Sequence, residues 1–231
     1  KDAETELGAK WGIQHSEDKL TIWNDKAILN RDVLLFGTTS KGNNKDTIGQ
    51  FGEGLKLGTL ALVREGKKVS IHTGKEFWTP KIEHSEKFNC EVLCFHIEQT
   101  EEEFKGVKIE VEGISSKTWG TFKNRFLFLK EKYLKYTWNT GNEVLYDSKM
   151  AGRIFSKGIY VCTDKRFKYG YNLALLDIDR DRKMANAGLT GFVWETWQGA
   201  VAKDPTLVPL LYNLLLDETE DTSIVRWSSW F

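Results

Sequence analysis

The residues best suited to chemistry form a glycine-rich run that leads into an apolar segment. The run reads Gly49-Gln50-Phe51-Gly52-Glu53-Gly54-Leu55-Lys56. Residues 55–63 are almost uniformly apolar and predict a helix buried nearly all round. Glycine lets the backbone adopt positive φ and approach a ligand closely. A helix start adds unpaired amides and the positive end of the helix dipole. The run therefore predicts a phosphate-binding turn, with an ordinary tight turn as the alternative.

Two better-known phosphate motifs fit this run poorly. A P-loop closes with Gly-Lys-Ser/Thr, whereas Leu55 follows Gly54 here. A dinucleotide fingerprint has the opposite glycine spacing and follows a strand directly, whereas the polar residues 37–45 precede this run. Those polar residues include Thr39, Ser40 and Lys41, which add hydroxyl groups and an ammonium to the predicted turn.

The elements around the run predict an α+β first half. Residues 20–24 alternate apolar and polar side chains, as a half-buried strand does. Residues 2–10 predict the end of a helix that stops near Gly8, and residues 30–36 predict a short helix or turn. Three strands are expected after the apolar helix, at residues 68–73, 91–98 and 107–112. Residues 1–113 thus predict helices that cover one face of a mixed, mostly antiparallel sheet.

The second half, residues 114–231, predicts a C-terminal α/β extension or subdomain. Residues 117–135 are basic and aromatic at roughly helical spacing, which is typical of an amphipathic helix. The expected strands are residues 154–162 and 173–178, and the expected helices are residues 192–201 and 205–216. Asp204 is the expected N-cap of the last helix, with Pro205 at its first position.

Composition limits the partners. The 231 residues carry 33 basic and 33 acidic side chains, so the chain has no overall attraction to nucleic acid or to anionic membrane. The longest apolar runs, residues 57–63 and 207–216, fall short of the roughly 18 residues that a membrane helix needs. Three cysteines are too few for a disulfide framework. We therefore expect an intracellular protein without a membrane partner, in the cytoplasm or alternatively the nucleus.

Three motifs together resemble a family. Residues 48–54 resemble the third motif of the GHKL superfamily, which comprises gyrase, heat-shock chaperones, histidine kinases and MutL, and are closest to the chaperone and MORC branch. Residues 36–41, Phe-Gly-Thr-Thr-Ser-Lys, resemble the MORC-type segment Phe-Gly-x-Ser-x-Lys. Residues 20–25 resemble the strand that ends in the adenine-binding aspartate. The motifs occur in the family's order and cover about residues 1–113.

The resemblance implies a Bergerat-type ATP-binding fold, a two-layer α/β sandwich with ATP or ADP between helices and sheet. Alignment of the strand places Asn24 at the adenine-binding position, whereas its chemistry favours Asp25; an amide oxygen can also accept from the adenine amino group. The implied nucleotide-binding residues are Asn24, Asp25, Thr39, Ser40, Lys41, Gly49, Gln50, Phe51, Gly52, Glu53, Gly54, Leu55 and Lys56.

Two further motifs complete the resemblance. Gly106-Val107 resembles the family's Gly-Thr on a late strand, with Thr73 as a weaker alternative for the threonine. Lys1-Asp2-Ala3 resembles the end of the first motif. In that case the glutamate base and the asparagine that ligates Mg²⁺ lie upstream of Lys1. No catalytic residue is therefore assigned here, and ATP hydrolysis is expected when the upstream segment is present.

The function implied is an ATP-binding module whose nucleotide state drives a conformational change, with a homodimer and a protein client among the implied partners. One alternative is a degenerate fold that serves as a protein-interaction scaffold, because Lys26 and Ile28 replace two motif glycines and Val107 replaces the threonine. The other is a nucleic-acid-binding protein that uses residues 117–135, and it is the less favoured.

Overall fold

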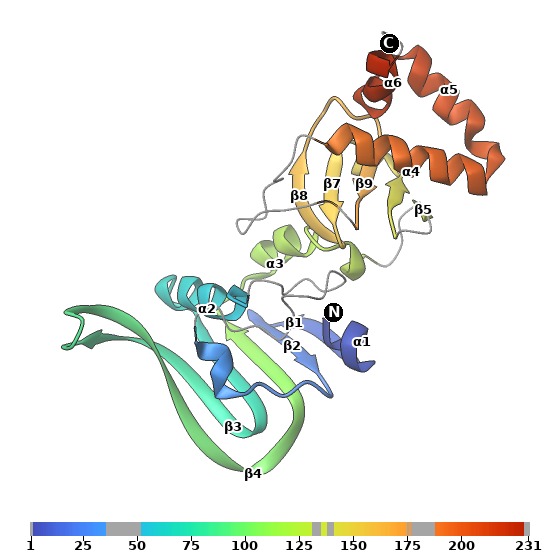
Figure 1. The fold of residues 1–231 in the computed structure, drawn as a ribbon. Helices are drawn as coiled ribbons and strands as arrows, with labels where there is room; N and C mark the ends of the chain where they lie inside the picture. Colours follow the sequence, from blue (N-terminus) through green and yellow to red (C-terminus); the bar gives the residue numbers. More distant parts are fainter. Residues whose placement is uncertain are drawn as a thin grey trace. The chain divides into compact units, whose positions relative to one another are not determined.

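The computed structural model describes residues 2–35, 52–130, 135–137, 141–174, 176 and 188–228 (Figure 1). The chain divides into two compact units, residues 1–121 and 122–231. Each unit has its own sheet and its own hydrophobic core. Within the described residues, no helix combines the length and the apolar character needed to cross a bilayer.

The first unit is built on a four-stranded antiparallel sheet. Its strands are β1 (Trp11–Ser16), β2 (Lys19–Asn24), β3 (Lys68–Ser85) and β4 (Cys90–Glu112). They lie in the order β1-β2-β4-β3, so β3 is an edge strand. This arrangement confirms the expected α+β class with an antiparallel sheet.

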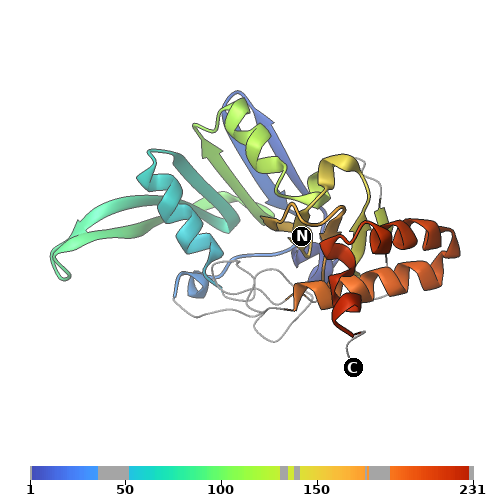
Figure 2. The same cartoon turned by 90° about the horizontal axis from the view of Figure 1, so that it is seen from above.

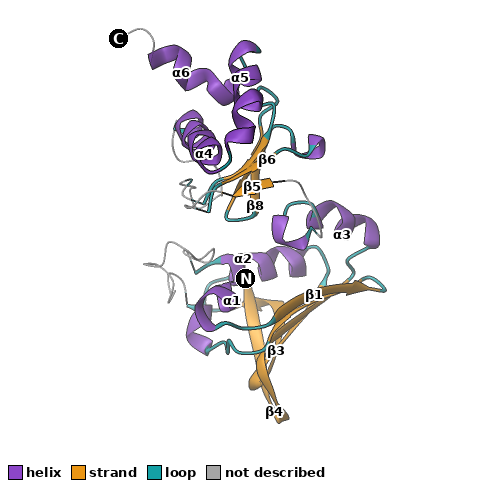
Figure 3. Cartoon of the chain, turned by 90° about the vertical axis from the view of Figure 1, so that its right-hand side faces the viewer, coloured by secondary structure: helices purple, strands orange, loops and turns teal. Residues whose placement is uncertain are grey.

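The helices of the first unit are α1 (Asp2–Leu7), η1 (Arg31–Leu34), α2 (Gly54–Arg64) and α3 (Ser116–Lys123). The first ends at Gly8, which has a φ of 59°, as the sequence predicted. Helix α2 packs against one face of the sheet (Figure 3). The core beneath it contains Ile71, Trp78 and Val111, with Leu55 and Leu62 of α2 packed against them.

The long hairpin of β3 and β4 differs from the three short strands expected. Residues 91–98 and 107–112 belong to one strand, which pairs with β3 as far as Ser85 (Figure 2). Strand β3 continues through Gly74, which lies at a bulge in the ladder. Pro80 lies on the edge strand, where a missing backbone donor costs no ladder bond.

The second unit is built on a five-stranded sheet. Its strands are β5 (Lys135–Thr137), β6 (Glu143–Leu145), β7 (Arg153–Ser156), β8 (Ile159–Thr163) and β9 (Gly170–Asn172), in the order β5-β6-β9-β7-β8. The strand expected at 154–162 is instead the hairpin of β7 and β8, which turns at Gly158. β9 ends before Leu173, and the described residues 173, 174 and 176 of the strand expected at 173–178 lie outside any strand, whereas residues 175, 177 and 178 lie outside the described residues.

Helices cover this second sheet. They are η2 (Leu127–Leu129), η3 (Ser148–Met150), α4 (Leu189–Lys203), η4 (Pro205–Leu207), α5 (Val208–Leu216), η5 (Glu220–Thr222) and α6 (Ser223–Ser228). The single helix expected over residues 117–135 is wrong, because α3 ends at Lys123 and η2 follows a turn. Asp204 accepts a hydrogen bond from the Thr206 amide, with Pro205 next to it, which confirms the expected cap.

Alternate residues of the second sheet enter two different cores. Val144 and Ile154 pack with Trp197 of α4 on one face. Leu145 and Phe155 pack on the other face, in a smaller core with Leu127 and Met150. Because successive strand residues point to opposite faces, η2 and η3 must cover the face that α4 leaves open.

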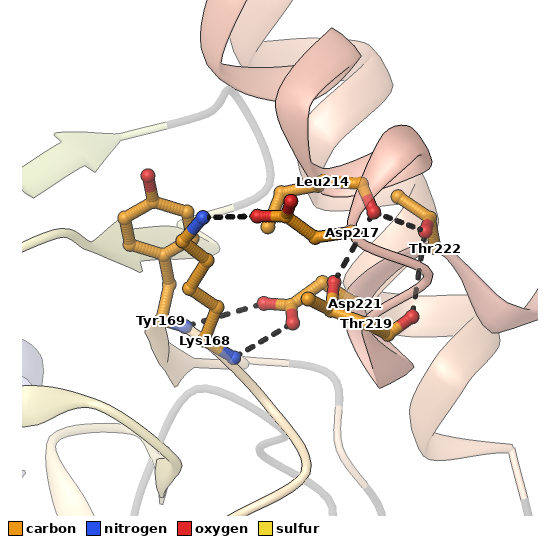
Figure 4. A network of polar contacts seen from close by, with 7 residues as sticks. All are labelled: Lys168, Tyr169, Leu214, Asp217, Thr219, Asp221 and Thr222. Carbon is orange, nitrogen blue, oxygen red and sulfur yellow. Dashed lines mark hydrogen bonds and ion pairs between the residues drawn. The ribbon is translucent and has the colours of Figure 1, made fainter.

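A buried carboxylate attaches the C-terminal helices to the second sheet (Figure 4). Asp221 is fully buried and accepts hydrogen bonds from the Lys168 amide at 2.8 Å and the Tyr169 amide at 3.3 Å. It also accepts from the hydroxyl of Tyr171, which in turn accepts from the Trp197 indole at 2.8 Å. Burial raises the pKa of Tyr171 well above its ordinary value, and the Asp221 charge raises it further.

Candidate nucleotide-binding site

Three strands of the first sheet bring predicted site residues side by side. The ladder pairs Asn24 of β2 with Val107 of β4, and Val107 with Thr73 of β3. Directly paired residues of antiparallel strands share one face of a sheet. Val107 and Thr73 are buried, and Val107 belongs to the core beneath α2. Thr73 and Val107, from the two candidates for the fourth motif, are therefore neighbours on the face of the sheet that α2 covers.

The backbone at Gly106 passes unusually close to the end of β2. Gly106 has a φ of 132°, and a β-carbon there would lie 1.9 Å from the carbonyl oxygen of Asn24. Only glycine fits this close approach. Gly106 is thus required by the close contact between β4 and the end of β2.

The start of α2 lies at the same end of the sheet. Helix α2 is joined to β3 by the short link Glu65–Lys67 and packs against that strand, so the two run in opposite directions. The 11 residues of α2 span about 16 Å. Residues 68–73 of β3 span about 17 Å in the opposite sense. The turn at Gly52 and Gly54 is consequently brought toward Thr73, Val107 and Asn24.

Gly54 opens α2 and leaves room for a ligand. A β-carbon at Gly54 would meet no atom of the described residues within 4 Å. The Leu57 amide donates to the Glu53 carbonyl at 3.0 Å, which is the first bond of the helix. By the geometry of an α-helix, the amides of Gly54 and Leu55 have no acceptor within the helix. The preceding Gly52 has a φ of 65°, a left-handed conformation that favours glycine.

The predicted site residue Lys56 is buried and points back toward the start of its own helix. Its ammonium donates to the carbonyl oxygens of Val33 at 2.9 Å, Leu35 at 2.6 Å and Gly52 at 2.9 Å. These bonds attach η1 to the glycine-rich turn. A contact between Lys56 and a nucleotide would have to form beside these bonds or replace one of them.

The two candidates for adenine recognition both contact backbone amides. The Asn24 amide oxygen accepts from the amides of Lys26 at 3.2 Å and Ala27 at 2.7 Å. Asp25 accepts from the amide of Lys10 at 2.8 Å. Because two donors fix the Asn24 oxygen toward the turn, its NH₂ group is the part of the side chain left to meet a base.

The residues that replace the two motif glycines have packing partners in the first unit. The Lys26 ammonium donates to the Leu7 carbonyl at 3.0 Å, at the end of α1. Ile28 is half exposed and lies over Gly74. Leu29 then donates its amide to the Thr73 hydroxyl at 2.9 Å, which holds the chain against β3 next to the bulge at Gly74.

An ion pair between Arg31 and Glu76 holds η1 beside β3. The Arg31 guanidinium lies 2.8 Å from a carboxylate oxygen of Glu76, which also accepts from the Trp78 indole at 2.9 Å. Hydrogen bonding by Arg31, and then by Trp78, lowers the pKa of Glu76. Charged and neutral hydrogen bonds therefore attach the chain after β2 and the helix η1 to both β3 and the start of α2.

A cavity of about 440 Å³ lies beside the first two turns of α2. It is lined by Leu34, Lys56, Leu57, Leu60, Val92, Leu93 and Phe95. Of these, only Lys56 was predicted as a site residue. The other lining residues were missed because residues 91–98 reach α2 only through the pairing of β4 with β3. That long-range pairing cannot be predicted from the sequence of either strand alone.

The remaining predicted residues cannot be placed. Thr39, Ser40, Lys41, Gly49, Gln50 and Phe51 lie outside the residues that the structure describes. Across the described ranges, no group of three or more His, Cys, Asp or Glu side chains could hold a metal ion. The asparagine expected to ligate Mg²⁺ was predicted upstream of Lys1 and stays a prediction.

No protein-family model matches the chain. An uncharacterised protein of Mycoplasma pneumoniae is 27% identical over 135 residues, which are 58% of this chain and 54% of that protein. The crystal structure of the ATPase region of Saccharomyces cerevisiae topoisomerase II is similar with a TM-score of 0.36 and 14% identity, over 66% of this chain and 56% of the yeast chain. The matches thus span about half the length of either relative.

Proposed function

We propose that the first unit binds ATP or ADP between the start of α2 and the part of the sheet where β2 ends at Asn24, beside Thr73 of β3 and Val107 of β4. The observation that carries the proposal is the convergence of these segments. They are far apart in the sequence, and each resembles a motif of the same superfamily. A fold that used them only as turns would not need them at one end of one sheet.

The chain's own residues suggest a division of roles. The amides at the start of α2 would bind the phosphates, since a helix N-terminus favours anions and Gly54 leaves open space there. Asn24 and Asp25 would meet the adenine edge. Val107 in place of a threonine offers no hydroxyl, so the neighbouring Thr73 is the hydroxyl available on this face. Mg²⁺ would neutralise the phosphate charge when bound.

The resemblance to the chaperone and MORC branch suggests a more specific function for this nucleotide-binding unit. Nucleotide state would then drive a conformational change, with a second copy or a protein client as partner and the cytoplasm as the compartment. Hydrolysis would need a glutamate base within hydrogen-bond reach of the attacking water. The sequence motifs assign that base to a segment upstream of Lys1.

The test is titration calorimetry with ADP and Mg²⁺ on the full chain and on two matched glycine variants. Gly54→Val should abolish binding, because its side chain fills the space in which phosphate would sit. Gly58→Ala lies in the same helix, also meets no atom within 4 Å, and should bind like the parent. A helical glycine replaced by alanine should also gain about 1 kcal/mol of stability.

Two results would contradict the proposal. One is the absence of binding heat at millimolar ADP, with or without the upstream segment. The other is equal binding by Gly54→Val and Gly58→Ala. Either result would favour the alternative that the fold is a protein-interaction scaffold. Lys26 and Ile28 in place of the motif glycines, and Val107 in place of the threonine, favour the same alternative. A melting temperature unchanged by nucleotide would agree with that alternative.

A further inference from the structure

We propose that the second unit carries an oxyanion site of its own, formed by Lys130, Lys149 and Arg153, which takes a phosphate group. The site lies on the face of the second sheet that η2 and η3 cover. Lys130 follows η2 directly, Lys149 belongs to η3, and Arg153 begins β7. This inference does not rest on the nucleotide site of the first unit.

Two cations meet at one sulfur atom. The Lys130 ammonium lies 3.8 Å from the Met150 sulfur, and an Arg153 guanidinium nitrogen lies 3.9 Å from the same atom. Thioether sulfur is only a weak acceptor. Met150 is itself buried, so the two cations gather at the edge of a small apolar core and neither charge is compensated there.

Carboxylates do not balance this cluster. Among the described residues, neither Lys130 nor Arg153 has a carboxylate within salt-bridge distance, although most half-buried cations of a protein are paired. Burial lowers the pKa of both groups, and for Lys130 the charges of Arg153 and Lys149 lower it further. Asp147 is the acidic group that acts on Lys130 in the opposite direction. The local charge is therefore an excess of positive charge held in partly desolvated positions.

Contacts with neighbouring residues preorganise the Arg153 guanidinium for binding a ligand. Its guanidinium lies 5.0 Å from the Phe155 ring centre and 5.2 Å from that of Tyr160, and it donates to the Asn124 carbonyl at 2.7 Å. These contacts fix the plane of the guanidinium while leaving further N–H groups for an acceptor. A preorganised arginine loses little entropy when it binds a planar or tetrahedral oxyanion.

Phosphate matches this arrangement in charge and in shape. Counted over the described residues, three cations stand against one carboxylate, which suits an anion that carries one to two charges. An arginine fork beside a lysine can bind separate phosphate oxygens. The phosphate can come from a small phosphorylated molecule or from a nucleic-acid backbone, and the experiment below separates the two sources.

The experiment compares melting temperatures of the full chain in chloride and in inorganic phosphate at equal ionic strength and neutral pH. The parent protein should melt at a higher temperature in phosphate. Lys130→Met removes one cation and keeps an apolar stem beside Met150. We expect it to be at least as stable as the parent in chloride, to weaken phosphate binding about tenfold, and so to lose the phosphate effect.

Three controls sharpen the outcome. Lys165→Met removes an exposed lysine of the same unit and should keep the full effect. Lys130→Arg restores the charge and should restore the effect. A single-stranded oligonucleotide should compete with phosphate only if the site accepts a nucleic-acid backbone. A melting temperature equal in the two salts, or a phosphate effect that survives in Lys130→Met, would overturn the proposal, and neither result bears on ADP binding at Gly54.

Discussion

Because Gly106 has no side chain, β4 can approach the end of β2 at Asn24 and Asp25 closely. A β-carbon would lie 1.9 Å from the Asn24 carbonyl oxygen, and the φ of 132° strains any other residue. Gly106→Ala should therefore lower the free energy of unfolding by about 3 kcal/mol or more. Urea denaturation would measure the loss. Gly120→Ala, where a β-carbon meets no atom within 4 Å, is the control and should not be destabilised.

Lys56 provides a second residue-scale prediction. Lys56→Met keeps the apolar stem but leaves three carbonyl oxygens without their shared donor. We expect a loss of about 2–3 kcal/mol in the free energy of unfolding. Lys68→Met removes a lysine whose side chain is 86% exposed and should change stability by less than about 0.5 kcal/mol. Equal losses in the two variants would show that the three bonds contribute no net stability.

Residue identity predicted only part of the site. The spacing of Gly52 and Gly54 at a helix start was readable, because backbone freedom and helix geometry act over a few residues. The partners of Lys56 were not readable, because the Val33 and Leu35 carbonyls reach it only through tertiary folding. Likewise, the orientation of Asn24 follows from two turn amides that its residue type does not specify.

At the scale of elements, the sequence predicted helices better than strands. The apolar run of α2 and the Asp204–Pro205 start of the η4–α5 segment depend on local spacing and capping, and both lie where expected. The continuity of β3 and β4 depends on pairing between distant residues, which carries a strand through Gly74 and Pro80. The basic aromatic stretch shows the same limit, because β8 pairs with Phe126 and interrupts the helical pattern.

The attachment of η5 to β9 predicts a dependence of stability on pH. Because the pKa of Tyr171 is raised in the folded state, its contribution is complete below its ordinary value of 10.0 and is lost as the pH rises beyond it. The free energy of unfolding should therefore fall above about pH 10, and less steeply in Tyr171→Phe. That variant should also lose about 1–3 kcal/mol at neutral pH, because Asp221 and Trp197 each lose a partner.

Denaturation of the variants across this pH range is the measurement. Tyr212→Phe, which changes a tyrosine that is 59% exposed on α5, should follow the parent protein at every pH. If Tyr171→Phe also follows the parent above pH 10, the buried hydroxyl is not the group whose titration weakens the fold.

At the scale of the whole molecule, the separate cores of the two units predict two separable unfolding events. Ile71 lies in the core of the first unit and Leu173 in that of the second. Ile71→Ala and Leu173→Ala should each cost about 2–5 kcal/mol, and each should lower a different transition. ADP should raise only the transition that Ile71→Ala lowers, since a ligand stabilises the unit that binds it. Calorimetric scans that show one transition, shifted alike by both variants, would exclude independent units.

The ammonium of Lys56 meets the chain on both sides of the segment between Leu35 and Gly52, since one donor group serves carbonyls at each flank. These bonds fix the positions of Leu35 and Gly52, the two flanks, relative to each other. Loop-closure entropy grows only slowly with length, so insertions or deletions between these flanks should leave the register of the sheet intact.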